Sequence, residues 1–390
     1  MSEKKGKNIL FINGILDGHF TGTVELVEEL VALGHNVTCY IVKKFEDRLK
    51  HTGATLRTFE VVIEKSIIDS LPKRAPPFAL NIFYYRNFID LVLDYYIKNE
   101  EKGKYDYLVL DRFFDGNEMN KIIQASNVIA IYTCFITEEP PSIKNFEQDR
   151  KNAYIPVNKK YNLNLREYVK MHYINDSKYK LMLTSKLLHP PTKKLDDSFY
   201  FIGPSIEKRP EDKSFTFKKD QNKKLIYISL GTIFNKNAEF FKKCIEAFKN
   251  NEKYQIIMAI GKKLDIKDLG EIPNNFLVYN YAPQPQILAL TDLFICHGGI
   301  NSINEGLLIN KTPFIVIPQE ADQFLNAKLI EKNEMGIALQ NDNITPELLK
   351  DTVNNIFNNE QKYKAGIAKI IQSFEETRNQ RKAILEKLFV

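Results

Sequence analysis

The stretch LFICHGGINSINEGLL, residues 293–308, decides the fold because its pattern of apolar residues changes halfway. Residues 293–297 begin with four apolar residues and end at His297, which is typical of a buried strand, and the residues from Asn301 onward have the spacing of a helix. Gly298 and Gly299 lie between the two, where the chain must turn. A strand that leads through a turn into a helix is the unit of an α/β sheet, so the stretch predicts a parallel sheet flanked by helices.

The same alternation runs through the second half of the sequence. Apolar runs typical of strands recur between helical segments, at 225–230, 255–260, 276–281, 293–297 and 313–318. Their regular return predicts a Rossmann-like domain in this half.

The first half begins with a similar unit. An apolar run at 8–12 is followed by the loop NGILDGHFTG, an amphipathic helix at about 23–33 and a β-branched run at 36–42. Further runs at 105–110 and 128–133 continue the alternation. These runs predict a second doubly wound parallel sheet.

Length and local composition set the domain organisation. The chain has 390 residues, which exceeds the ~250–300 at which a single core stops growing, so two domains are expected. The stretch 207–223 is polar and charged without apolar periodicity and is predicted to be a linker. We therefore predict domains at 1–206 and 224–370, with a helix at 371–390 that packs back on the first domain.

Composition excludes several classes of protein. The net charge is +6 and the lysines are spread over many predicted helices, so nucleic-acid binding is not expected. The four cysteines are far apart and form no CxxC pair, which favours reduced thiols and a cytoplasmic location. The first apolar run is too short for a signal peptide and no apolar stretch reaches 18 residues, so no transmembrane segment is expected.

Two segments rich in aromatic residues, 66–99 and 138–174, do not fit the alternation and are predicted to be insertions in the first domain. The aromatic residues of the first segment have three interpretations, in order of preference: core packing, the lining of an apolar acceptor pocket, and contact with a membrane surface. They are Phe78, Phe83, Tyr84, Tyr85, Phe88, Tyr95 and Tyr96.

Polar and glycine residues follow several predicted strands of the second half. Ligands of open α/β sheets bind at the carboxyl ends of the strands, so these residues are expected to share one edge of the sheet. They are Gly231, Thr232, Tyr281, Gln284, His297, Gly299, Asp322 and Gln323.

The helix after His297 has the features of a diphosphate site. Gly298 and Gly299 allow a close approach of the backbone, and the unpaired N–H groups at a helix N-terminus favour an anion. Asn301 and Ser302 add side-chain donors. Glu305 lies one turn deeper on the face of Asn301, where a carboxylate accepts hydrogen bonds from ribose hydroxyls.

A family resemblance rests on this region. The stretch HGGINSINEGLLINKTPFIVIPQEADQFLNAKLI (297–330), with YAPQPQIL (281–288) and YISLGT (227–232) before it, resembles the donor-binding signature of family 1 UDP-glycosyltransferases. It is most similar to the bacterial macrolide and flavonoid branch. The resemblance implies a GT-B fold, in which two Rossmann-like domains face each other across a cleft, the first binding the acceptor and the second the UDP-sugar.

The resemblance also implies a role for each matching residue. Tyr281, where many relatives have tryptophan, would stack on uracil, and Gln284 would contact the base or ribose. Glu305 would hold the ribose. The diphosphate would be bound by His297, Asn301, Ser302 and Thr232, and the sugar hydroxyls by Asp322 and Gln323, a pair that favours glucose.

In the first domain, His19 stands where the family has a catalytic histidine. The usual asparagine-proline pair is replaced here by Phe20, Thr21 and Gly22. The expected partner is Asp111, after the run 105–110, with Asp115 as the competing choice. Histidine accepts a proton near neutral pH, and an aspartate on its far nitrogen fixes the tautomer.

The implied reaction inverts an α-linked donor sugar to a β-linked product on a hydroxyl of a small apolar or aromatic acceptor. The sequence contains no Asp-x-Asp triplet, and neither a metal nor another cofactor is expected beside the UDP-sugar.

Other interpretations stay open. Gly14, Gly18 and Gly22 do not form the dinucleotide fingerprint, which disfavours a dehydrogenase. A GT-B enzyme of another purpose, such as a lipid-linked or cell-wall N-acetylglucosaminyltransferase or a UDP-sugar epimerase, is one alternative, and the motif PQEADQ argues against it. The other is a non-catalytic UDP-sugar-binding protein, which predicts that His19 is dispensable. We assign no role to His35, His51, His172 and His189.

Overall fold

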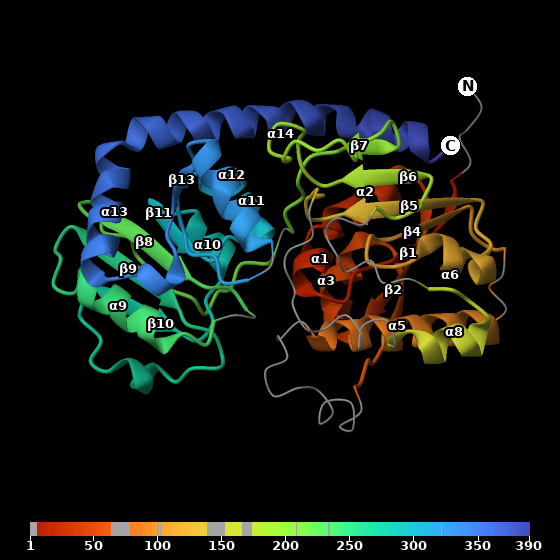
Figure 1. The fold of residues 1–390 in the computed structure, drawn as a ribbon, viewed down its shortest axis with the longest axis horizontal. Coiled ribbons are helices and arrows are strands. Elements are labelled where there is room, and N and C mark those ends of the chain that lie inside the picture. Colours follow the sequence, from red (N-terminus) through yellow and green to blue (C-terminus); the bar gives the residue numbers. More distant parts are fainter. Residues whose placement is uncertain are drawn as a thin grey trace. The chain divides into compact units, whose positions relative to one another are not determined.

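The computed structural model describes residues 6–63, 79–99, 101, 103–138, 153–165, 174–207, 209–232, 235–320 and 322–390. The chain divides into two compact units (Figure 1). Unit 1 comprises Met1–Glu207 with Phe374–Val390, and unit 2 comprises Lys208–Ser373. Within the described ranges, no helix is long and apolar enough to cross a membrane.

Unit 1 contains a seven-stranded sheet with the order β3-β2-β1-β4-β5-β6-β7, in which every pair is parallel. The order changes direction between β1 and β4, which is the topological switch point of the sheet. The strands are β1 (Asn8–Ile12), β2 (Asn36–Val42), β3 (Thr55–Phe59), β4 (Tyr107–Asp111), β5 (Asn127–Tyr132), β6 (Tyr179–Met182) and β7 (Phe199–Phe201).

Helices cover both faces of this sheet. They are α1 (Asp17–Thr21), α2 (Val24–Ala32), α3 (Glu46–Leu49), α5 (Ala79–Lys98), α6 (Gly116–Ile123) and α8 (Ile155–Tyr161), with short 3-10 helices at Lys43–Phe45 and Lys50–Thr52. Successive residues of a strand point to opposite faces. On β1, Leu10 and Ile12 therefore pack in the core that contains α5, whereas Ile9 and Phe11 pack in the core that contains α2.

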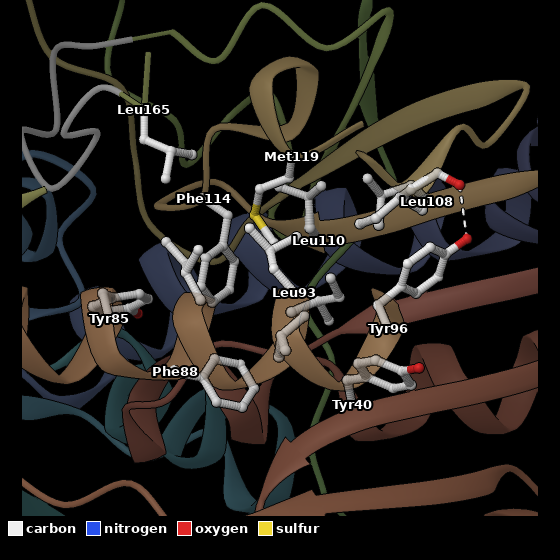
Figure 2. Close-up of a cluster of buried hydrophobic side chains, with 14 of the residues drawn as sticks. Tyr40, Tyr85, Phe88, Leu93, Tyr96, Leu108, Leu110, Phe114, Met119 and Leu165 are labelled. Carbon is white, nitrogen blue, oxygen red and sulfur yellow. Dashed lines mark hydrogen bonds between the residues drawn. The ribbon is translucent and has the colours of Figure 1, made fainter. Parts of the chain in front are cut away.

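The aromatic residues of α5 form much of the first of these cores. Figure 2 shows Tyr85, Phe88 and Tyr96 of this helix packed with Leu108 and Leu110 of β4. These three aromatic side chains are fully buried, so the interpretation as core packing is confirmed for them. The remaining aromatic residues of the segment differ: Phe83 and Tyr95 pack against the core while partly buried, Tyr84 is exposed, and Phe78 lies outside the described residues.

Unit 2 contains a six-stranded parallel sheet with the order β10-β9-β8-β11-β12-β13. Its strands are β8 (Lys224–Ser229), β9 (Tyr254–Ala259), β10 (Phe276–Tyr279), β11 (Leu293–Cys296), β12 (Phe314–Val316) and β13 (Gly336–Ala338). Its helices are α9 (Ala238–Phe248), α10 (Gln284–Leu288), α11 (Ile300–Asn310), α12 (Gln323–Lys332), α13 (Pro346–Asn358) and the first part of α14 (Glu360–Leu388), with 3-10 helices at Ile266–Leu269 and Asn341–Asn343. The predicted fold class of two doubly wound parallel sheets is confirmed.

The second part of α14 belongs to unit 1. Arg378 Nη1 donates to the carbonyl of Pro204 at 2.7 Å and to Glu25 on α2 at 3.2 Å, and Arg381 Nη1 donates to Ser205 Oγ at 2.8 Å. The apolar residues that follow are buried in the core that contains α2, namely Leu385, Leu388 and Phe389. Residues 374–390 therefore complete the core of unit 1.

Candidate active site

His19 and Asp111 lie together at the switch point of the unit 1 sheet. His19 lies on α1, which follows β1, and Asp111 is the last residue of β4, the strand that pairs with β1. The distance from His19 Nδ1 to Asp111 Oδ2 is 2.7 Å. The Asp111 side chain is completely buried, and 14% of the His19 side chain is exposed. The sequence predicted this pair, and the structure brings it together.

Both carboxylate oxygens of Asp111 have a partner. Oδ1 accepts from the backbone N–H of Phe113 at 2.9 Å, which leaves Oδ2 directed at His19. A carboxylate can only accept, so Nδ1 of His19 carries the proton and donates it. The other ring nitrogen, Nε2, is then the basic one, and it is the atom that can take a proton from a substrate.

Two further residues lie against His19, and the sequence did not predict a role for either of them in this site. Thr133 Oγ1 lies 3.0 Å from His19 Nδ1, at the end of β5 beside β4. A Cβ on Gly14 would lie only 2.6 Å from the Cβ of His19, so a glycine is needed for the loop to pass this close. The predicted strand 128–133 included Thr133, whereas β5 ends at Tyr132, so the rule that polar residues at neighbouring strand ends converge was not applied to Thr133.

Asp115 is placed differently from Asp111. Its Oδ1 accepts from the backbone N–H of Glu118 at 3.2 Å, so it caps the N-terminus of α6. Of the two candidates for the partner of His19, Asp111 is therefore the one in contact with it.

In unit 2, His297 is enclosed by glycines. It directly follows β11, and a Cβ on Gly231 or on Gly299 would lie 2.6 or 2.5 Å from its ring. Gly231 and Gly298 also have positive φ angles, +75° and +84°, which glycine adopts without the strain of a side chain. Gly299 then stands at the N-cap of α11, and no side chain caps the N-terminus of this helix.

Burial lowers the pKa of His297 from 6.5 to about 4, although the backbone of Ser229 acts in the opposite direction. The imidazole is therefore neutral at neutral pH. It can donate one hydrogen bond to an anion beside α11, but it brings no positive charge there.

This burial predicts a pH dependence of stability. Between pH 6.5 and 4, His297 binds a proton in the unfolded chain but not in the folded one, so the free energy of unfolding falls as the pH falls through this window. Replacing His297 with glutamine is expected to make the fall shallower. Urea unfolding of both proteins at several pH values measures this, and parallel curves would contradict it.

Glu305 lies at the centre of a second polar group in unit 2. Its carboxylate, only 2% exposed, accepts from Gln284 Nε2 at 2.6 Å and from Arg209 Nη2 at 3.2 Å. Gln284 Nε2 also lies 3.3 Å from Ser302 Oγ. The structure thus joins three predicted residues from α10 and α11. Arg209 was not predicted, because it lies in a stretch whose composition indicated only a linker.

The remaining predicted residues lie around these groups. Tyr281 is 65% exposed, so a face of its ring is open for stacking. Asp322 and Gln323 lie at the start of α12, where Gln323 Oε1 accepts from the backbone N–H of Gln319 at 2.8 Å. Asn326, on the same helix, contacts the turn before α11, because its Nδ2 donates to the carbonyl of Gly298 at 2.8 Å.

The last two predicted residues lie near the glycines of this site. Thr232 is exposed and directly follows Gly231, and Asn301 lies half-buried in the first turn of α11. Among the described residues, no group of three or more histidine, cysteine, aspartate or glutamate side chains could hold a metal ion.

The chain is similar to known glycosyltransferases in sequence and in fold. A family model described as the glycosyltransferase family 28 C-terminal domain matches residues 231–381. An uncharacterized UDP-glucosyltransferase of Bacillus subtilis, YdhE, is 28% identical over 383 residues, which covers 95% of either chain. The oleandomycin glycosyltransferase of Streptomyces antibioticus is also 28% identical, over 86% of this chain and 80% of its own.

A solved structure shows the same fold. The glycotransferase of kitacinnamycin superimposes with a TM-score of 0.77 and covers 98% of this chain and 99% of its own, at 20% sequence identity. The two parallel sheets and this GT-B neighbour agree with the sequence relatives. Together these findings support a UDP-glycosyltransferase similar to the bacterial enzymes of family 1.

Proposed function

We propose that the enzyme transfers glucose from UDP-glucose to a hydroxyl of a small apolar or aromatic acceptor, with inversion at the anomeric carbon and without a metal ion. The observation that carries this proposal is the contact of 2.7 Å between His19 Nδ1 and Asp111 Oδ2 at the switch point of unit 1. Such a pair has the geometry of a general base with its orienting carboxylate.

The acceptor hydroxyl is activated at His19. Its proton moves to Nε2 as its oxygen attacks the anomeric carbon, and Asp111 stabilises the imidazolium that forms. Only one displacement occurs, so an α-linked glucose becomes a β-linked product. The bond to the UDP oxygen breaks as the new glycosidic bond forms. The ring of Phe113, which is 7% exposed and whose centroid lies 4.4 Å from that of His19, packs against the imidazole and makes its surroundings apolar.

The donor is bound by unit 2. The N-terminus of α11, with Asn301, Ser302, Thr232 and neutral His297, meets the charge of the diphosphate in place of a metal ion. Tyr281 stacks on uracil, with Gln284 beside the nucleoside. Glu305 accepts from the ribose hydroxyls, and Asp322 with Gln323 binds the hydroxyls of glucose.

The names of two similar proteins support the acceptor class. One is named an oleandomycin glycosyltransferase, and the other is described as the glycotransferase of kitacinnamycin. We therefore place macrolides beside phenols and flavonoids among the acceptors to be tested.

The test is a mass assay with UDP-glucose, a panel of phenols, flavonoids and macrolides, and an excess of EDTA. The expected product is heavier by one hexose, is formed at an unchanged rate with the chelator, and has a β-linked sugar by NMR. Loss of transfer with EDTA that returns with Mg²⁺ would contradict metal independence, and an α-linked product would contradict inversion. UDP binding without product on any acceptor would favour the non-catalytic alternative.

A further inference from the structure

The helix that carries His19 is too short to hold its own position. α1 has five residues and its N-cap, Leu16, has no side-chain hydrogen bond to the helix. Isolated helices of this length are unstable, because so few hydrogen bonds offset the cost of ordering the chain. The orientation of His19 must therefore come from contacts that other elements make with α1.

Arg48, on α3, makes three of those contacts through one guanidinium group. Nη2 donates to Thr21 Oγ1 at 2.7 Å, and Nη1 donates to Asp17 Oδ1 at 3.2 Å. The same group lies over the ring of Phe20, 4.7 Å from its centroid. Arg48 thus touches α1 at its first residue and at the two residues after His19.

The same guanidinium group forms an ion pair with Glu207. Nε of Arg48 donates to Glu207 Oε1 at 2.7 Å, and Nη2 donates to Oε2, so the pair is bidentate. The Glu207 side chain is 3% exposed, compared with 24% for Arg48. A buried carboxylate strongly favours a fixed cation beside it. Glu207 therefore holds the guanidinium plane in one orientation, and it is also the last residue of unit 1 before the chain enters unit 2.

We propose that Arg48 is a positioning residue for the transfer reaction: it joins α1 to Glu207 and thereby keeps Nδ1 of His19 against Asp111. The inference rests on the proposed function of His19 as the base. Since Arg48 does not touch His19 itself, it acts through the helix and not on the substrate.

The geometry needs arginine in particular. The planar guanidinium donates hydrogen bonds to Glu207, Thr21 and Asp17 at the same time. The ammonium of lysine can replace the charge, but it cannot donate to all three partners in this geometry. The neighbouring Lys44 contacts α1 at Asp17, at 3.2 Å, with both side chains more than half exposed, and its ammonium also lies over the ring of Phe45. It cannot substitute for Arg48.

The test compares Arg48→Lys and the double variant R48M/E207Q with wild type, using UDP-glucose and the best acceptor of the panel. The double variant avoids leaving a buried carboxylate without its cation. A displacement of about 1 Å at a catalytic group can cost about 100-fold in rate, so kcat is expected to fall about 10- to 100-fold in both, while KM for UDP-glucose stays within about twofold. Hydrogen exchange of the peptide around α1 should become faster in both variants.

Arg378→Met is the matched control. Its pair with Glu25 is also a partly buried arginine–glutamate contact in unit 1, and it touches neither α1 nor His19. It is expected to lower thermal stability without changing kcat. Equal kcat losses in R378M, or wild-type kcat in R48M/E207Q, would overturn the positioning role. His19→Ala, assayed in parallel, separates the two hypotheses: activity lost in H19A but kept in R48M/E207Q overturns only the inference, whereas an active H19A overturns the proposed base and the inference with it.

Discussion

Replacing His19 with alanine is expected to lower kcat about 100- to 10,000-fold, the range that a positioned general base contributes. Without the imidazole, the acceptor hydroxyl attacks while still holding its proton. The donor residues all lie in unit 2, so KM for UDP-glucose and the affinity for UDP are expected to stay near the wild-type values. Initial rates of product formation and calorimetric titration with UDP measure the two effects.

His51→Ala is the control for this experiment. His51 is an exposed histidine of unit 1 whose Nε2 lies 2.7 Å from Glu28 Oε1 and which has no contact with the pair. Its loss is expected to leave kcat unchanged. Transfer by H19A at the wild-type rate would remove the base from our mechanism, and loss of UDP binding in H19A would show that the variant is damaged beyond its active site.

Replacing Asp111 with asparagine is expected to lower kcat about 1,000- to 10,000-fold, although the two side chains have the same shape. The backbone N–H of Phe113 fixes which way the new amide points, because it needs the oxygen as its acceptor. The NH₂ group then faces Nδ1 of His19, which must give up its proton to accept. The proton then lies on Nε2, so this nitrogen cannot accept the proton of the acceptor hydroxyl.

Asp115→Asn is a matched control for this change. Asp115 caps α6 through its side-chain oxygen, and asparagine caps about as well as aspartate, so D115N should keep the wild-type rate. The double variant H19A/D111N should be no slower than H19A alone, since the two residues act as one unit. Losses that multiply in the double variant would mean that Asp111 acts independently of His19.

The strands were largely predictable from the sequence because buried parallel strands are nearly continuous apolar runs. The runs at 8–12 and 36–42 have the bounds of β1 and β2. β3 was not predicted, since its residues TLRTF are mostly polar. α1 was predicted as part of a loop, because a helix of five residues shows no period that a sequence pattern can reveal.

Residues of the site were predictable where they directly follow a strand. Asp111 was found in this way, whereas His19, in the loop after the first predicted strand, was assigned through the family resemblance; the structure places the two in contact. Thr133 and Arg48 were missed for different reasons. Thr133 was counted as part of its strand, whereas Arg48 reaches α1 from an element 27 residues away from Thr21, through a contact that only the folded chain creates.

Because α14 contributes its first part to unit 2 and its second part to unit 1, the two units are completed in a different order from that of their first residues. A ribosome releases residues 1–207 well before residues 374–390, yet Leu385, Leu388 and Phe389 fill the core that contains α2. Until they emerge, this face of the nascent chain stays uncovered, and Glu25 lacks its arginine partner. All residues of unit 2 are therefore made before unit 1 is complete, and the unit that carries His19 acquires its final core only after residues 374–390 have been made.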